Sequence, residues 1–334
     1  SIDLNWHEAR EAVLKLCHKA DVIVENFRPG TMKTFGLDYE SVRQQNPAVV
    51  YVSMSGFGQN TPWSTRPAFA PTVQAESGAT QTQMDHFGDD LLQPVTDWAS
   101  HADVYTGLEG AIAVLAGLNK RNATGTGLHG DVSMMATMLA VNERLHAQIN
   151  ELDATDEPLA LGAPESPIFK VADGSLVTIA ASPVSSGVFM RYCGMMGRSD
   201  LRTDSRFATP ALRRKNLKAL LDEVQNWMRS FRSFEELEYQ VSGAGGLAVG
   251  KVRTAADLLE TDWAQAAEPT YTSLVGDLEI RLPKGPWLFN GKDTGALSAA
   301  APRGANNREV LSEAGFDDAT IKAWEDAGIL SSDL

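Results

Sequence analysis

The chain has 334 residues, with 29 basic and 43 acidic side chains, so its formal net charge at pH 7 is −14. A protein that binds the phosphate backbone of a nucleic acid needs a basic face, which this charge disfavours. Hydrophobic residues make up 43% and charged residues 22% of the chain, a composition that excludes a disordered or fibrous protein. At roughly 150 residues per domain, the length predicts two domains.

The cellular setting follows from the cysteines and from the apolar runs. Cys17 and Cys193 are too few and too far apart for a disulfide framework or a cysteine-built metal site, so a reducing compartment is expected. No run approaches the roughly 18 to 20 apolar residues of a membrane span, and residues 1–10 have neither a basic nor an apolar signal region. We expect a cytoplasmic protein with no membrane or nucleic-acid partner.

The first part of the chain alternates between helical and extended patterns. Apolar residues at helical spacing predict a helix over 7–19, and the apolar run 22–24 predicts a buried strand that ends at the loop 25–30. A second helical stretch over 39–45 precedes the apolar run 49–54. Alternating helices and strands predict the α/β class, with a parallel sheet covered by helices.

Two loops follow these strands: NFRPG at 26–30 and SGFGQ at 55–59. Ligands of open parallel sheets bind beyond the carboxyl ends of the strands, so both loops are candidate binding elements. The alternative is that the proline and the glycines of these loops only turn the chain.

A long helix is predicted to begin near Asp103. The apolar residues downstream follow the spacing of one helical face: Leu108, Ala111, Ile112, Leu115 and Leu118. The TGTG segment at 124–127 interrupts this pattern. A second long helix is then expected to carry Val132, Met135, Met138, Leu139, Asn142 and His146. The methionines at 134, 135 and 138 are interpreted as core-filling residues.

Composition predicts the order of the domains. Two segments interrupt the periodic patterns: an acidic, proline-bearing one at 151–168 and a Pro/Gly-rich one at 283–306. The predicted organisation is a large α/β domain (1–150), a linker (151–168), a small α+β domain (169–282), and a linker with a C-terminal return to the large domain (283–334). Within these bounds the patterns predict a hairpin over 171–180 and helices over 185–196, 211–231, 233–242 and 307–327.

Two features of the sequence do not predict a binding site: a glycine-lysine segment and the spacing of the histidines. The segment from Gly245 to Lys251 fits the start of a phosphate-binding loop, but Val252 follows it without the hydroxyl that binds magnesium, and a helical pattern precedes it. The six histidines lack paired i, i+4 spacing, so no metal site is predicted. His101 is kept as a candidate base because it lies two residues from Asp103.

Asp103 allows two interpretations. Aspartate is a favoured helix N-cap, where its carboxylate accepts hydrogen bonds from the first turn. A carboxylate at the positive end of a helix also stays ionised at neutral pH, and an ionised, partly desolvated carboxylate is suited to nucleophilic attack.

Segments along almost the whole chain resemble family III coenzyme A transferases, the group that includes formyl-CoA transferase and the carnitine CoA-transferases. The segments occur in the family's order. They are ADVIVENFRPGTM (20–32), NP…VYVSMSGFGQ (46–59), RPAFAPTVQAESGA (66–79), ADVYTGLEGAIAVLAGL (102–118), TGTGLHGDVSM (124–134), DSRFATPALRRKNLKALL (204–221) and APRGANNREVLSEAG (301–315).

The resemblance implies site residues. The family's nucleophile is an aspartate at the start of the helix that here reads DVYTGLEGAI, which maps it to Asp103. The loop of Asn26, Phe27 and Arg28 matches CoA contacts of the family, and the loop of Ala68 and Phe69 lies near the cofactor and the nucleophile in relatives. Local attraction of acidic substrates to an acidic chain is expected from basic residues such as Arg28 and Arg66.

The resemblance also implies the fold, the reaction and the partners. It implies an open, Rossmann-like parallel sheet and two ring-like chains that interlock as a homodimer. The implied reaction moves CoA from an acyl-CoA to a small carboxylic acid, through a mixed anhydride and an aspartyl-CoA thioester on Asp103. Acyl-CoA then acts as a substrate, with no tightly bound cofactor and no metal.

Departures from the family pattern keep alternatives open. Thr34 stands where some relatives have a basic CoA contact, no counterpart of a glycine-rich flap occurs between 151 and 185, and the N-terminal part of the family domain is absent. A 2-methylacyl-CoA racemase of the same family pairs its aspartate with a histidine near the position of Phe69, whereas no histidine occurs between His18 and His86. A transferase is therefore favoured over a racemase, and the third reading is a non-catalytic CoA-binding homologue.

Overall fold

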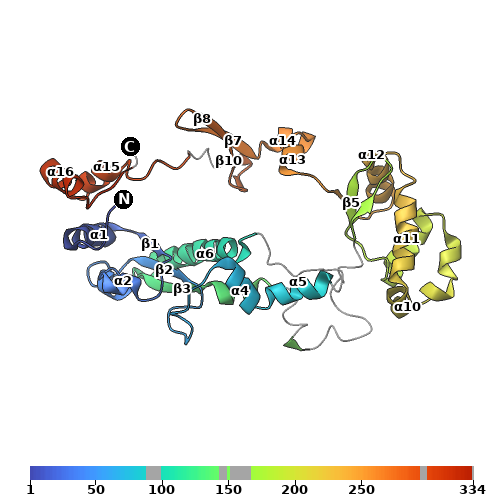
Figure 1. Ribbon diagram of the computed structural model, residues 1–334, viewed down its shortest axis with the longest axis horizontal. Helices are drawn as coiled ribbons and strands as arrows, with labels where there is room; N and C mark the ends of the chain where they lie inside the picture. The colour runs from blue at the N-terminus through green and yellow to red at the C-terminus, as the bar shows by residue number, and fades with distance from the viewer. Residues whose placement is uncertain (88–98, 143–148, 151–166, 294–298, 333–334) are drawn as a thin grey trace. The chain divides into compact units, whose positions relative to one another are not determined.

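The computed structural model describes residues 1–87, 99–142, 149–150, 167–293 and 299–332 (Figure 1). These residues form two compact units. The first unit comprises Ser1–Gln81, Val95–Asn142 and Thr270–Leu334, and the second comprises Thr82–Pro94 and Glu143–Pro269. The predicted linker 151–168 lies outside the described residues, except for positions 167 and 168.

A parallel three-stranded sheet forms the centre of the first unit. Its strands β1 (Val22–Glu25), β2 (Val50–Ser55) and β3 (Leu128–Ser133) are hydrogen-bonded in that order, with Val24 opposite Val52 and Val52 opposite Gly130. The mixed α/β architecture with a parallel sheet is therefore confirmed. The helices of this unit are α1 (His7–Lys19), α2 (Thr31–Thr34), α3 (Tyr39–Val42), α4 (Ala70–Glu76), α6 (His101–Thr124) and α7 (Met134–Ala140). Helix α5 (Ala79–Phe87) begins in the first unit and continues into the second.

Successive side chains of β2 point to opposite faces of the sheet and contact different helices. Val50 faces α6, where a Cβ atom added to Gly117 would lie 2.5 Å from Val50 Cγ1. Glycine at this position therefore lets the helix lie directly against the strand. On the opposite face Tyr51 is buried with Cys17 of α1, and its hydroxyl donates to the carbonyl of Leu37 at 2.9 Å. Both faces of β2 are thus covered, as a parallel sheet requires.

The predicted second long helix is wrong, because Val132 lies in a strand and Asn142 lies beyond the end of α7; His146 lies outside the described residues. Residues 128–133 form strand β3, and α7 begins only at Met134, where Ser133 caps it by accepting from the Ala136 N–H at 3.1 Å. The polar residues His129 and Asp131 break the apolar pattern of a strand in this segment. The segment is extended because it pairs with β2. Two other predicted helices are divided: 211–231 at Asn216, and 307–327 at Gly315, whose φ of 91° ends the first part.

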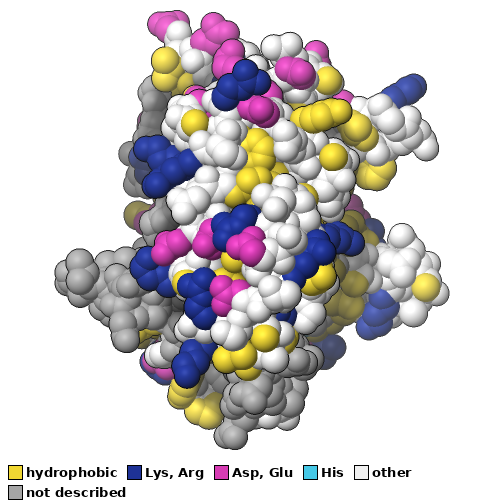
Figure 2. All heavy atoms as spheres, turned by 90° about the vertical axis from the view of Figure 1, so that its right-hand side faces the viewer, with side chains coloured by type: hydrophobic (Ala, Val, Ile, Leu, Met, Phe, Trp, Pro, Cys, Tyr) yellow, Lys and Arg dark blue, Asp and Glu magenta, His cyan; other side chains and the backbone are white. Residues whose placement is uncertain are grey.

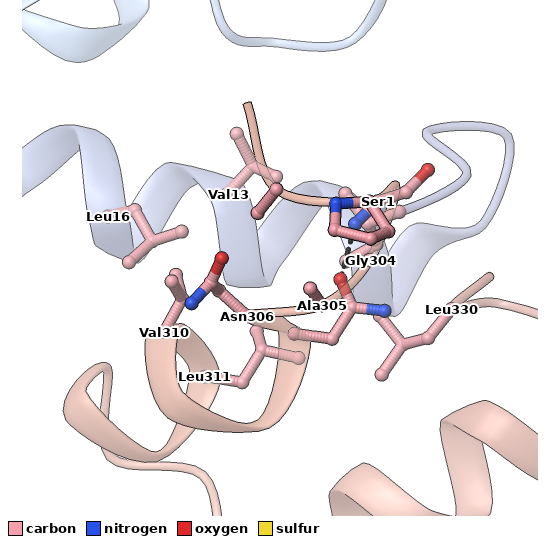
Figure 3. Close-up of a pocket in the computed structure, with 13 residues that line it drawn as sticks. Ser1, Val13, Leu16, Gly304, Ala305, Asn306, Val310, Leu311 and Leu330 are labelled. Carbon is pink, nitrogen blue, oxygen red and sulfur yellow. Dashed lines mark hydrogen bonds between the residues drawn. The ribbon is translucent and has the colours of Figure 1, made fainter. Parts of the chain in front are cut away.

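The C-terminal segment packs against the start of the chain. Leu311 of α15 (Asn307–Glu313) and Ile321 of α16 (Asp318–Asp326) are buried with Ala12 of α1. An apolar cavity of about 280 Å³ lies between α1 and residues 301–311, with Val13 and Leu16 on one side and Val310 on the other (Figure 3). The remaining strands of the first unit are β7 (Thr270–Val275), β8 (Leu278–Pro283), β9 (Leu288–Phe289) and β10 (Lys292–Asp293).

The second unit is α+β. An antiparallel sheet of β4 (Phe169–Lys170), β5 (Leu176–Ile179) and β6 (Val249–Lys251) packs on α11 (Leu217–Met228) around a core that contains Val177, Val224 and Met228. The predicted hairpin over 171–180 is confirmed as the turn between β4 and β5. Its other helices are α9 (Ser186–Met195), α10 (Pro210–Lys215), α12 (Phe234–Glu238), α13 (Ala255–Leu259) and α14 (Asp262–Ala267), with 3-10 turns at Ser199–Arg202 and Ser205–Phe207 and a π-helical turn at Tyr239–Ala244.

Candidate active site

A cavity of about 530 Å³ opens at the carboxyl ends of β1 and β2, beside the first turns of α6. This is where ligands of open parallel sheets bind, and the volume lies within the range of roughly 300 to 1,000 Å³ of small-molecule sites. Fifteen residues line it: Asn26, Phe27, Arg28, Pro29, Met54, Ser55, Gly56, Ser64, Arg66, Ala68, Phe69, Asp103, Thr106, Gly107 and Met134.

The cavity brings together the predicted nucleophile and the five predicted CoA-binding residues, but not His101, the candidate base. Asn26, Phe27 and Arg28 reach it from the loop after β1, Ala68 and Phe69 from the segment that enters α4, and Asp103 from α6. Four residues of the NFRPG loop line the cavity, and so do Ser55 and Gly56 of the SGFGQ loop, so both loops lie at one site.

Asp103 is not the cap of its helix. Ser100 occupies the N-cap position, without a side-chain cap hydrogen bond, and Asp103 is the third residue of the 24-residue helix α6. Its exposed carboxylate thus lies in the first turn, where the helix dipole stabilises negative charge. Within the described residues its side chain has no hydrogen-bond or ion-pair partner, so it is available to a ligand.

The backbone that carries Asp103 is fixed by buried contacts. Ala102 is fully buried, and its N–H donates to Gln74 Oε1 of α4 at 3.3 Å. The Thr106 hydroxyl donates to the carbonyl of Ala102 at 2.6 Å. Gln74 is itself only 3% exposed. Rigid packing of this kind holds a reactive side chain at one position of the cavity wall.

Gly56 forms a tight part of the same wall. A Cβ atom added to it would lie 2.0 Å from Ala68 Cβ, a separation that requires either the β2 loop or the Ala68 loop to move. The Gly56 carbonyl also accepts from the N–H of Met135 at 3.0 Å, which fixes the loop from its other side. The close approach therefore sets the shape of the cavity.

We expect Gly56→Ala to lower the free energy of unfolding by about 1–3 kcal/mol, because overpacking strains both loops. Adding Ala68→Gly to Gly56→Ala removes the opposing methyl group and should restore most of this loss. Guanidinium unfolding of the wild type, the two single variants and the double variant measures the coupling between the positions. Additive effects of the two substitutions would contradict the packing argument.

Arg66 adds positive charge to the cavity. Its Nη2 lies 2.5 Å from Glu76 Oε1 of α4, and its guanidinium lies over the rings of Trp63 and Phe57, with Cζ at 4.4 Å and 5.0 Å from the ring centroids. Arg28 is the second basic residue of the lining. An anionic substrate of this acidic chain therefore meets two local cations.

Sequence reasoning missed several lining residues. Thr106 and Gly107 lie three and four positions after Asp103, so helical spacing alone would have placed them on the same face. Met134, interpreted as core filler, is buried in the core around Phe57 and also lines the cavity. No pattern in the sequence indicated that Ser64 lines the cavity. His101 stacks on Tyr105, with centroids 5.5 Å apart, and is not part of the cavity lining.

A polar cavity of about 270 Å³ shares Arg28 with the larger one. It lies on the face of the sheet opposite α6, where Ser53 Oγ and His129 Nε2 are 2.9 Å apart. Tyr39 stacks on the His129 ring at 5.2 Å. Burial raises the pKa of Tyr51, which lines the same cavity, so its phenol stays protonated.

Charges of both signs are interspersed on the face shown in Figure 2, so this face forms no continuous basic patch. Many basic side chains of the second unit have acidic partners, such as Arg198 with Asp200 and Glu223, and Lys218 with Asp222. No helix in the described residues is long and apolar enough to cross a membrane. No group of three or more His, Cys, Asp or Glu side chains among these residues is arranged to hold a metal ion.

Comparisons with known proteins show to which family the chain belongs. The family model for CoA-transferase family III matches residues 1–307. An acyl-CoA transferase of Fusarium pseudograminearum is 29% identical and aligns with 99% of this chain and 72% of its own length. Succinyl-CoA–D-citramalate CoA-transferase of Chloroflexus aurantiacus is 30% identical, over 94% of this chain and 77% of its own length.

The fold has relatives among solved structures. A crystal structure of Rv3272 from Mycobacterium tuberculosis superposes with a TM-score of 0.75 at 25% sequence identity, covering 92% of this chain and 82% of that one. Since the family model covers far more than half of the residues and the fold agrees, the chain belongs to CoA-transferase family III.

Proposed function

We propose that this protein transfers CoA from an acyl-CoA to a carboxylic acid, with Asp103 as the nucleophile. The observation that carries the proposal is the exposed Asp103 carboxylate in the first turn of α6, within the cavity that Asn26, Phe27 and Arg28 also line. Membership of a family of CoA-transferases supports the reaction class.

The proposed reaction consists of two reversible exchanges. A carboxylate oxygen of Asp103 attacks the thioester carbonyl of the donor, the C–S bond breaks, and a mixed anhydride and CoA thiolate are formed. The thiolate then attacks the aspartyl carbonyl of the anhydride, which gives an aspartyl-CoA thioester and releases the donor acid as its carboxylate. The acceptor carboxylate reverses both steps and leaves with CoA. The net reaction converts one CoA thioester and one carboxylate into another CoA thioester and another carboxylate, so no external energy source is needed.

The surrounding residues have separate roles in this proposal. Arg28 and the backbone of Asn26 and Phe27 bind the phosphates and pantetheine of CoA. Backbone N–H groups in the first turn of α6 stabilise the oxyanions that form at the two carbonyls. Phe69, which is 72% exposed, offers an apolar contact to the acyl chain or to pantetheine. By family resemblance, we further propose an interlocked homodimer with a Rossmann-like CoA-binding domain that works in the cytoplasm.

Trapping the covalent intermediate tests the proposal. Incubation with an acyl-CoA in the absence of an acceptor acid should add the mass of CoA less one water, and peptide mapping should locate it on Asp103. Hydroxylamine should release the label. A chain that binds CoA, as shown by a calorimetric titration, but forms no adduct with any acyl-CoA of a broad panel would instead be a non-catalytic CoA-binding homologue.

The racemase alternative makes a different prediction. Racemisation needs two acid/base groups on the α-carbon, and the described cavity lining contains Asp103 but no histidine. We therefore expect no deuterium at the α-carbon of 2-methylbutyryl-CoA, a 2-methylacyl-CoA, after incubation in heavy water without an acceptor acid. Mass spectrometry of the recovered thioester measures this directly, and exchange at a catalytic rate would favour the racemase.

A further inference from the structure

Arg66 is a cation of the cavity wall that the proposed chemistry at Asp103 leaves unused. We propose that Arg66 binds the free carboxylate of a dicarboxylic acyl group, so that the protein selects dicarboxylic acids and their CoA thioesters. This inference rests on the proposed function, because it assigns the distal end of the substrate whose other end reacts at Asp103. It makes Arg66 a specificity-determining residue.

Three neighbours hold the guanidinium of Arg66 in place. Glu76 Oε1 lies 2.5 Å from Nη2, the Trp63 ring centroid lies 4.4 Å from Cζ, and the Phe57 ring centroid lies 5.0 Å from it. The two rings are in edge-to-face contact at 5.5 Å with their planes at 88°, so the cation contacts two nearly perpendicular rings that also contact each other. A guanidinium that is paired on one side and stacked on aromatic rings loses little further freedom when it binds an anion.

The donors of Arg66 are only partly used. The guanidinium has five N–H donors, and within the described residues only Nη2 has a side-chain acceptor, Glu76. The side chain is 42% exposed and lines the cavity. The remaining donors offer the planar fork that binds a carboxylate through two parallel hydrogen bonds.

The charges of the cavity favour a second carboxylate during turnover. Its charged lining residues are Arg28, Arg66 and Asp103. When Asp103 becomes an anhydride or a thioester it loses its negative charge, and the N–H donors of Arg66 that Glu76 leaves unused then face the substrate without an anion in the lining. A dicarboxylic acyl group supplies an anion that accepts from these donors, whereas a monocarboxylic one leaves them to water.

A phosphate of CoA is the competing anion. Arg28 belongs to the loop that matches the family's CoA contacts, and it has no ion-pair partner in the described part of the chain. Arg66 instead lies in the segment before α4, beside Ala68 and Phe69. We therefore assign the phosphates to the side of Arg28 and the distal carboxylate to Arg66.

Succinyl-CoA and butyryl-CoA separate these assignments, because the two acyl groups have the same four-carbon length and differ in the terminal carboxylate. The rate of adduct formation on Asp103 is measured against acyl-CoA concentration in the wild type, Arg66→Gln and Arg66→Lys. In Arg66→Gln we expect the ratio of second-order rate constants, succinyl over butyryl, to fall about 10-fold to 100-fold. The saturating rate with butyryl-CoA should stay within about threefold, and Arg66→Lys should restore part of the ratio.

Arg43→Gln is the matched control. Arg43 also pairs with a glutamate, Glu40 at 2.8 Å, and also lies over an aromatic ring, Tyr39 at 5.6 Å, but it does not line the cavity. This variant should keep the wild-type ratio. An unchanged ratio in Arg66→Gln would overturn the inference. So would equal weakening of both thioesters together with weaker binding of free CoA, since that result would make Arg66 a phosphate contact.

A binding measurement keeps the inference testable without turnover. Calorimetric titration with free succinate should show binding to the wild type that weakens at least 10-fold in Arg66→Gln, whereas butyrate should bind both proteins equally weakly. If the wild type forms no adduct with either thioester, the proposed function fails and the titration alone decides the role of Arg66. If adducts form but succinate binds both proteins alike, only the inference fails. Thermal unfolding of each variant verifies that it is folded.

Discussion

Asp103→Asn is expected to reduce CoA transfer by about 10⁴-fold or more, which is the scale of loss when the nucleophile of a covalent mechanism is removed. Asparagine has nearly the same size and tolerates the first helical turn, so α6 and the cavity should persist. Its amide cannot form the mixed anhydride. The measurement is the rate of CoA transfer between an acyl-CoA and an acid, together with the mass of the protein after incubation with acyl-CoA.

Glu109→Gln provides the control for this substitution. Glu109 lies on the same helix, six positions after Asp103, and does not line the cavity. The Glu109→Gln substitution removes one negative charge, as Asp103→Asn does, and the transfer rate should stay within about twofold of the wild-type rate. Asp103→Asn with more than a tenth of the wild-type rate, or a CoA adduct mapped to another residue, would contradict the assignment.

The largest expected effect on stability comes from Arg213 in the second unit. This arginine is only 3% exposed. Its Nε donates to the Val184 carbonyl at 2.6 Å, Nη1 to the Phe207 carbonyl at 2.7 Å, and Nη2 to Ser186 Oγ at 3.0 Å. Burial lowers its pKa. The cation therefore joins α10 to residues 184–186 and to Phe207 through neutral acceptors.

Arg213→Ala is expected to lower the free energy of unfolding of the second unit by about 3–5 kcal/mol, because it leaves two buried carbonyls without donors and opens a cavity. Denaturant unfolding followed by circular dichroism measures the loss. Lys215→Ala on the same short helix is the control; its side chain is exposed, so less than about 0.5 kcal/mol is expected. A loss below about 1 kcal/mol for Arg213→Ala would show that Arg213 does not hold these segments together.

Local patterns predicted much of the first unit. The helix over 7–19 and the strands near 22–24 and 49–54 agree with α1, β1 and β2, because amphipathic spacing and short apolar runs are local signals. The end of the helix at Glu313 could also have been predicted from the sequence, since a glycine such as Gly315 often ends a helix and an aspartate such as Asp317 often caps the start of the next one. The strand over 128–133 could not be predicted from the local sequence, because its polar residues are extended only through pairing with β2.

By itself the sequence determined that an aspartate lies in the first turn of a long helix and that NFRPG and SGFGQ follow strands, although the first strand is not buried as predicted, since Val24 is 51% exposed. These properties depend on neighbours within a few residues. Only the tertiary structure decided that the segments around 26, 56, 68 and 103 line one cavity. It also decided that Ser100, and not Asp103, stands at the cap, and that Glu76, Trp63 and Phe57 fix the guanidinium of Arg66. The reason is physical: periodicity sets which face a side chain occupies, whereas strand pairing and helix packing set which faces meet.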